Sequence, residues 1–229
     1  NAFLEFGDGS MLFTSLNGLF YLPAEETEKF LSNPESDQNI YAVPIRYSDS
    51  NPSPNTVNMK VDSRGNLWVN LVTSGLEKMS SANIPDFLKK SMETGVVSNS
   101  SGNLVVERDG FLMSGYLSNQ LLFVDLENGE KSISKFDQGI NLQGATYIYE
   151  DPNHELWVYT WGSGFYKLEQ KTGITLVNNT TRPGTFESNF MLGFEEDENG
   201  FWIGTGAEVQ FYDLDKKEFT ALNERLSNT

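Results

Sequence analysis

The sequence predicts an all-β fold, and its composition is the first reason. In 229 residues there are 20 Gly, 16 Phe, 9 Tyr and 4 Trp, together with 22 Asn and only 7 Ala. Aromatic residues favour strands, Gly and Asn favour tight turns, and a shortage of Ala removes the best helix former. The chain is therefore expected to be mostly strand, with many turns.

An internal repeat is the second reason. Three clear copies combine an Asp, a short polar turn and a Trp-containing apolar run, at 62–70, 151–160 and 197–205, and two weaker copies lie at 9–15 and 109–115. Regular internal spacing indicates stacked structural repeats. The Trp position is marked by Leu12, Trp68, Met113, Trp157 and Trp202, which are spaced by 56, 45, 44 and 45 residues.

Each copy is flanked by further short apolar segments that are typical of strands. One precedes the Trp and two follow it, joined by turns rich in Gly, Asn and Asp. The predicted strands are 57–61, 146–149 and 190–194 before the Trp, and 18–22, 75–79, 120–125, 164–168, 209–213 and 218–222 after it. A lone four-stranded sheet exposes its edges and faces, so such units must stack. Radial stacking is a β-propeller, and five blades of about 45 residues fill the single domain 3–229.

The segment 23–54 exceeds the period and is predicted to be an insertion. Within it, 24–31 has the pattern of a short helix, whereas 48–55 is rich in Ser, Asn and Pro and is typical of a loop. A second helix is predicted over 83–93, where apolar residues recur at helical spacing. Both helices are interpreted as additions to blades.

Charge and composition exclude several classes of function. The formal net charge of −16 and a pI near 4.4 disfavour binding to nucleic acid or to anionic membrane surfaces. There is no Cys and a single His, His154, which excludes cysteine chemistry and multi-histidine metal sites. No catalytic residue, metal ion or cofactor is expected, and His154 is interpreted as a turn residue because it stands where other copies carry Gly.

The recurring Asp and Trp residues are interpreted as structural. Asp62 with Gly65, and Asp197 with Gly200, have the pattern of turns in which Asp accepts backbone N–H bonds and Gly takes a positive φ. The three repeated Trp residues are expected to pack between blades. The acidic run 195–198 is interpreted as a solvated turn.

Trp161 differs, because it lies in a turn where a large apolar residue gains little from folding. In a propeller, the turns that follow each second strand share one face with the crossovers between blades. The expected ring of turns is 15–18, 72–74, 116–120, 161–163 and 205–208, with crossovers that contain Gln143 and Arg182. Candidate ligand-binding residues on this face are Trp161, Tyr116, Asn119, Asn17 and Arg182. Aromatic, amide and guanidinium groups suit sugar recognition, whereas the competing interpretation packs Trp161 on a neighbouring loop or a partner domain.

These repeats resemble the two-component regulator propeller repeat, which is roughly a strand, Asp-x-x-Gly-x-Leu-Trp-Ile-Gly-Thr, a Gly-Gly turn and Leu-x-x-Tyr-Asp. The segment 197–205 matches almost residue by residue, with one deletion before Trp202, and 62–69 matches well, although Asn70 then replaces a Gly. The segment 160–166 matches the part after the Trp, while the first and third repeats lack the Trp.

The resemblance implies the periplasmic ectodomain of an inner-membrane hybrid histidine kinase of the type found in gut Bacteroides. Such a segment would sense an oligosaccharide or another small ligand and would catalyse nothing itself. Its partners would be further blades of the same chain, since the family uses seven-bladed propellers, or a second copy in a homodimer. The ending 225–229 resembles a lead-in to another blade, so a fragment is expected, and Asn1-Ala2 resembles a tag remnant or a mature terminus left by cleavage.

Two alternatives remain open at this point. A closed five-bladed propeller would act as a lectin or a glycoside hydrolase, and a pure interaction scaffold would bind no small ligand. A hydrolase needs two carboxyl groups about 5–10 Å apart, but the acidic residues cluster in turns opposite the expected ring. A lectin would need similar aromatic sites in several blades, and only one turn carries a Trp.

Overall fold

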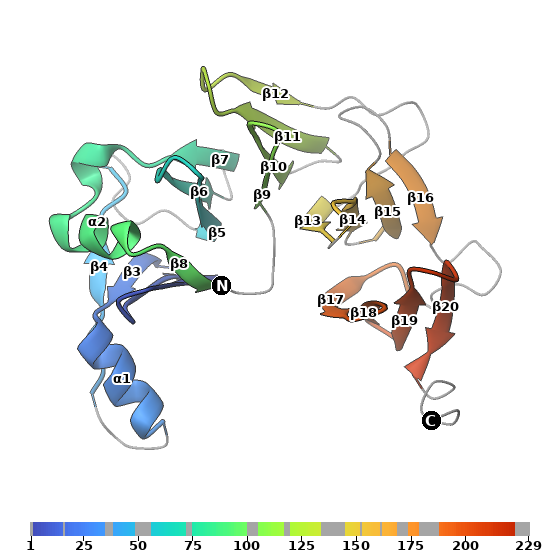
Figure 1. The fold of residues 1–229 in the computed structure, drawn as a ribbon, viewed down its shortest axis with the longest axis horizontal. Helices are drawn as coiled ribbons and strands as arrows, with labels where there is room; N and C mark the ends of the chain where they lie inside the picture. The colour runs from blue at the N-terminus through green and yellow to red at the C-terminus, as the bar shows by residue number, and fades with distance from the viewer. Residues whose placement is uncertain are drawn as a thin grey trace. The chain divides into compact units, whose positions relative to one another are not determined.

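A computed structural model gives the fold of this chain in two compact units, Asn1–Ser100 and Ser101–Thr229 (Figure 1). Each unit is described by itself. The structure describes residues 2–15, 17–34, 39–48, 56–71, 75–99, 105–116, 120–133, 145–151, 153–160, 162–168, 174–178 and 188–222.

The first unit contains a five-stranded antiparallel sheet with strand order β4-β3-β2-β1-β8. Its strands are β1 (Phe3–Phe6), β2 (Met11–Ser15), β3 (Gly18–Leu22), β4 (Val43–Ile45) and β8 (Val96–Asn99). Helix α1 (Ala24–Ser32) confirms the helix predicted at the start of the insertion. The segment 23–54 is more than an addition, however, because it supplies β4, the strand that pairs with β3.

A three-stranded sheet completes the strands of the first unit. It consists of β5 (Thr56–Val61), β6 (Leu67–Leu71) and β7 (Gly75–Lys78) in that order. The expectation of a four-stranded unit is wrong here. After β7 the chain forms the short 3₁₀ helix η1 (Ser81–Asn83) and α2 (Asp86–Glu93), and its next strand, β8, pairs with β1 of the other sheet.

Helix α2 begins three residues later than the predicted span 83–93. Pro85 occupies its N-cap position with an extended backbone, and Ile84 before it is extended as well. A residue that precedes proline is pushed away from helical angles by the proline ring. Ile84 is therefore buried ahead of the helix rather than on its apolar face.

The second unit contains three four-stranded antiparallel sheets, and each follows the order of its strands along the chain. The strands are β9 (Val105–Arg108), β10 (Phe111–Tyr116), β11 (Gln120–Asp125), β12 (Lys131–Ile133), β13 (Ala145–Glu150), β14 (Leu156–Thr160), β15 (Phe165–Leu168), β16 (Ile174–Asn178), β17 (Met191–Asp197), β18 (Gly200–Thr205), β19 (Val209–Asp213) and β20 (Glu218–Ala221). The mostly-β prediction is confirmed, and the small antiparallel sheets give the chain a propeller-like architecture.

Hydrophobic clusters join neighbouring sheets within each unit. One cluster in the first unit combines β1–β4 with β5, β6 and α2. In the second unit, one cluster joins β9–β11 to β13–β15, and another joins β14 and β15 to β17–β19. Burial of these faces in sequence order is the stacking that the repeat predicted.

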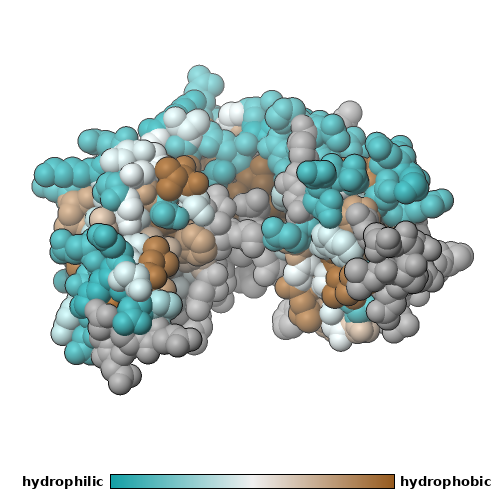
Figure 2. All heavy atoms as spheres, turned by 60° about the horizontal axis from the view of Figure 1, so that its bottom comes forward, coloured by the Kyte–Doolittle hydropathy of each residue, from teal (hydrophilic) through white to brown (hydrophobic). Residues whose placement is uncertain are grey.

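The surface shown in Figure 2 is mainly hydrophilic, and hydrophobic side chains form small separate patches on it. This agrees with a chain in which acidic residues outnumber basic ones two to one. Among the described residues, no helix is both long and apolar enough to cross a membrane.

Candidate functional site

Three Asp–Trp pairs recur at one end of the second strands. Trp68 Nε1 donates to Asp62 Oδ2 at 2.7 Å, and Trp157 Nε1 donates to Asp151 Oδ2 at 2.9 Å. The third pair, Asp197 Oδ2 with Trp202 Nε1, also lies at 2.9 Å. Each pair ties the hairpin turn to the strand that follows it, so these carboxylates hold the fold together.

The other carboxylate oxygen shapes the turn. Asp62 Oδ1 accepts hydrogen bonds from the backbone N–H groups of Arg64 at 2.9 Å and Asn66 at 2.7 Å, and Asp151 Oδ1 accepts an equivalent pair. Burial by itself raises the pKa of Asp62, but the bonds from Trp68 and Asn66 outweigh it and hold that pKa below its ordinary value.

The prediction for His154 is confirmed, and that for Gly200 is wrong. His154 has φ +61°, like Gly65 at +77° in the same turn position, and its exposed ring lies 2.9 Å from the Glu150 carboxylate. Gly200 pairs with Asp197 as part of β18 and does not take a positive φ. Glycine is required there for space, because a Cβ would lie 1.9 Å from the carbonyl oxygen of Tyr212.

The repeated Trp residues differ in burial. Trp157 is 2% exposed and stacks on Phe165 at 5.0 Å between ring centroids, while Phe201 of the next sheet meets it edge-on at 5.3 Å. This confirms the packing role between sheets for Trp157. Trp68 is also buried, whereas Trp202 is partly exposed.

Threonine-capped turns lie at the opposite end of the second strands. Thr160 Oγ1 donates to the carbonyl of Gly164 at 3.0 Å and accepts from the N–H of Ser163 at 2.9 Å. Thr205 Oγ1 likewise donates to a carbonyl and accepts from an N–H, both of them of Glu208, at 3.2 and 3.1 Å. These turns, around 161–163 and 205–208, belong to the face expected to carry the ligand-binding residues.

Hydrogen bonds join these turns to the crossover that enters β17. The N–H of Gly162 donates to the carbonyl of Asn189 at 3.0 Å, and the N–H of Gly206 donates to the carbonyl of Phe190 at 2.9 Å. The expectation that second-strand turns and crossovers share a face is confirmed here. Phe190 is 53% exposed beside these turns, and the sequence analysis missed it because its pattern is that of a strand residue.

The predicted site residues are placed only in part. Trp161, Asn119 and Arg182 lie outside the described residues. Tyr116 ends β10 opposite Gln120, and its side chain lies outside the description. Asn17 belongs to the first unit, where it is exposed in the β2–β3 turn and its N–H donates to Ser15 Oγ at 3.0 Å.

Nothing described resembles a metal centre. In the part of the chain that the structure describes, no group of three or more His, Asp or Glu side chains is arranged to hold an ion. The acidic run 195–198 spans the end of β17 and its turn, and Asp197 in it binds Trp202.

Comparison with known proteins shows the fold. No protein-family model matches the sequence, and no curated protein matches it significantly. Among solved structures, the extracellular domain of BT3049 from B. thetaiotaomicron, assigned to a hybrid two-component system, is similar with a TM-score of 0.60 and 16% identity. The extracellular domain of BT4673 from the same organism, also assigned to a hybrid two-component system, gives 0.61 and 14%.

These similarities extend over nearly the whole chain but over only part of each neighbour. The chain is covered to 93% by the BT3049 match and to 97% by the BT4673 match, and it spans 27% and 31% of those two chains. The C-terminal WD40 domain of Sif2 is similar with a TM-score of 0.57 and 10% identity, covering 96% of this chain and 57% of that one. All three matches support a propeller-like fold.

Proposed function

We propose that this chain is part of the extracytoplasmic sensor of a two-component system, and that it binds an oligosaccharide without catalysing a reaction. The fold similarity to two Bacteroides ectodomains supports the sensor role. The sequence supports it independently, because 62–69, 160–166 and 197–205 resemble parts of the regulator propeller repeat.

The ligand site of this proposal is the turn face of the second unit. The observation that carries it is the hydrogen bond from the N–H of Gly162, the residue after Trp161, to the carbonyl of Asn189 in the crossover before β17. Exposed Phe190 adds a second aromatic surface next to that turn. Aromatic faces stack on the apolar faces of sugar rings, while Asn119 and Arg182 would supply hydrogen bonds.

The wider assembly is part of the same proposal. Five blades, marked by Leu12, Trp68, Met113, Trp157 and Trp202, would join further blades of the same polypeptide in a larger periplasmic propeller. A homodimer is the alternative assembly. Signal output would be a rearrangement that passes beyond this chain to the kinase.

The decisive experiment is titration of oligosaccharides against the wild-type chain and its Trp161→Ala variant. Affinity is expected to fall by about tenfold, equivalent to about 1.4 kcal/mol, with thermal stability unchanged. Phe30→Ala is the matched control, because Phe30 is an aromatic residue of α1 that is 47% exposed in the first unit. Equal affinities of wild type and Trp161→Ala for every sugar that binds would overturn the site.

A further inference from the structure

The sheet β17–β20 packs one of its faces on the sheet β13–β16 of the same unit (Figure 1). Phe201 and Ile203 of β18 lie in that contact, and both are 0% exposed. Because side chains alternate along a strand, Trp202 between them points to the opposite face of the sheet. We call that opposite face the Trp202 face.

The sheet β13–β16 shows what covers such a face one repeat earlier. Trp157 occupies the position of Trp202, since the indole of each donates to an Asp at the start of its hairpin. The face that carries Trp157 is covered by the next sheet along the chain, whose Phe194 stacks on Tyr159 at 5.3 Å between ring centroids. The Trp202 face is the equivalent surface, one repeat further along.

We infer that the Trp202 face receives a further four-stranded sheet of the same polypeptide, which inserts a large aromatic side chain over Gly193 and Gly204 and places a Lys or Arg beside Glu195. The inference rests on the proposed larger propeller, and it names the surface by which this chain would continue that propeller. Continuity with the interface between β13–β16 and β17–β20 favours a sheet over a small ligand, because stacked repeats bury equivalent faces.

The Trp202 face has room for a large side chain. Gly204 lies two residues after Trp202, where β14 carries Tyr159, and it pairs directly with Gly193 and Val209, so all three share this face. A Cβ built on Gly193 would meet no described atom within 4 Å, and the nearest to one on Gly204 would be the backbone of Gly193, at 3.8 Å. The two glycines therefore leave a hollow, and Val209 beside it is 41% exposed.

Glu195 sets the charge that a covering sheet needs. It pairs directly with Trp202, so its side chain lies on the same face, and it is exposed. Covering a carboxylate is costly unless the partner supplies a cation or hydrogen bonds. A second copy of this chain would bring its own Glu195 and the same net charge of −16, so charge favours a different sheet that carries Lys or Arg.

The test is the reactivity of an introduced thiol, because the chain contains no Cys of its own. Val209→Cys is treated with a maleimide in the 229-residue chain and in the full-length native polypeptide, and labelling is read on the peptide that contains position 209. Labelling should be at least about tenfold slower in the full-length polypeptide, because a covered side chain reacts only when the interface opens. Ile133→Cys, at a 46% exposed position of β12, is the matched control and should react equally in both.

A second variant fills the hollow. Gly204→Leu should leave the melting temperature of the 229-residue chain nearly unchanged, since its Cβ meets no close atom among the described residues. In the full-length polypeptide it should lower the melting temperature and, combined with Val209→Cys, restore fast labelling at position 209.

Equal labelling of Val209→Cys in the two polypeptides overturns the inference. Labelling of the 229-residue chain that slows as its concentration rises would also overturn it, because a second copy would then cover the face. Oligosaccharide binding is measured separately with Trp161→Ala, so the failure of either proposal is distinguishable from the failure of the other.

Discussion

The two units bury their sheets with different side chains. The cluster of the first unit is mainly Leu, Ile, Val and Met, and it includes residues of α2. The cluster between the last two sheets of the second unit contains Trp157, Phe165 and Phe201, stacked in offset and edge-on pairs. The apolar faces of repeated hairpins can thus be covered either by a regular aromatic interface or by a segment that departs from the repeat.

The segment α2–β8 is that departure. Ser91 Oγ donates to Asp8 Oδ2 at 2.6 Å and lies 3.0 Å from the Tyr21 hydroxyl, which joins α2 to the first sheet. The N–H of Gly7 donates to the carbonyl of Gly95 at 2.9 Å just before β8. A sheet edge that would otherwise be exposed is therefore paired by the chain itself.

Loss of the aromatic interface should lower the stability of the folded chain more than any other change considered. Trp157→Ala removes a buried ring and leaves Asp151 without its indole donor, so we expect a loss of about 3–5 kcal/mol in the free energy of unfolding. Trp202→Ala, at the same position of a partly exposed sheet face, should cost about half as much. Urea denaturation of both variants measures this, and equal losses would contradict the role of the neighbouring sheet.

Removal of the Asp–Trp pair of the first unit should cause the next largest loss of stability. Asp62→Ala leaves Trp68 Nε1 and two turn N–H groups without their acceptor, at an expected cost of about 2–3 kcal/mol. Asp125→Ala is the matched control, because Asp125 accepts a turn N–H at 2.7 Å in an exposed hairpin. A control variant as unstable as Asp62→Ala would show that the indole contact adds nothing.

The same carboxylate predicts a pH dependence. Because hydrogen bonds outweigh burial and lower the pKa of Asp62 in the folded chain, its stabilising contribution is complete above the unfolded value of about 4. That contribution is lost as pH falls through the lower, folded pKa. In Asp62→Asn the free energy of unfolding should therefore fall less steeply between neutral and acidic pH than in the wild type. Urea denaturation in buffers across this range measures the fall, and an equally steep fall in both proteins would refute the prediction.

A smaller loss of stability is expected when the hydrogen bonds that join α2 to the first sheet are removed. Ser91→Ala removes the hydrogen bonds to Asp8 and Tyr21, at a cost of about 1–2 kcal/mol. Amide exchange in β8 should accelerate, while Ser98→Ala, an exposed change in β8 itself, should leave it slow. If Ser91→Ala leaves the exchange of β8 unaltered, these bonds do not hold the segment.

The smallest change in stability is expected for substitutions of His154, which has a left-handed backbone conformation in its turn. His154→Gly should change stability by less than about 1 kcal/mol, since Gly adopts a positive φ freely but loosens the unfolded chain. His154→Val should cost about 1–2 kcal/mol, because a β-branched residue tolerates this backbone poorly. Thermal melting distinguishes them, and equal melting temperatures would contradict a turn role.

The repeat itself was predictable from the sequence, because its determinants are local. A carboxylate five or six residues before a Trp on one hairpin reaches the indole wherever that hairpin lies, as Asp62 and Asp151 show. Likewise, the placement of the turn around 161–163 beside a crossover followed from strand order alone. Only part of the candidate site can be compared with its prediction, since Trp161, Asn119 and Arg182 lie outside the described residues.

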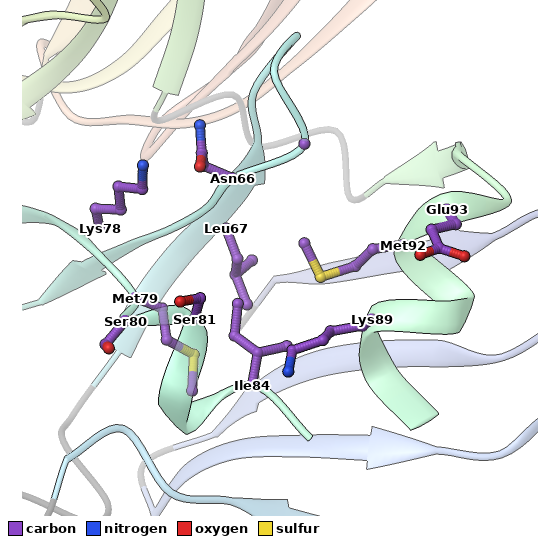
Figure 3. A pocket seen from close by; sticks show the side chains of 11 residues that line it. Asn66, Leu67, Lys78, Met79, Ser80, Ser81, Ile84, Lys89, Met92 and Glu93 are labelled. Carbon is purple, nitrogen blue, oxygen red and sulfur yellow. The ribbon is translucent and has the colours of Figure 1, made fainter. Parts of the chain in front are cut away.

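Tertiary structure alone decided the features that join distant segments. Residues 96–99 contain no signal for pairing with β1, which lies some ninety residues earlier, so the five-stranded sheet could not be foreseen. A cavity of about 570 Å³ forms where the β5–β6 turn and the start of β6 meet α2 (Figure 3), and the exposure of Phe190 depends on which groups cover it. The sequence by itself determined the strands, turns and repeat period through short-range contacts, whereas sheet edges and cavities depend on contacts between elements that have no common pattern.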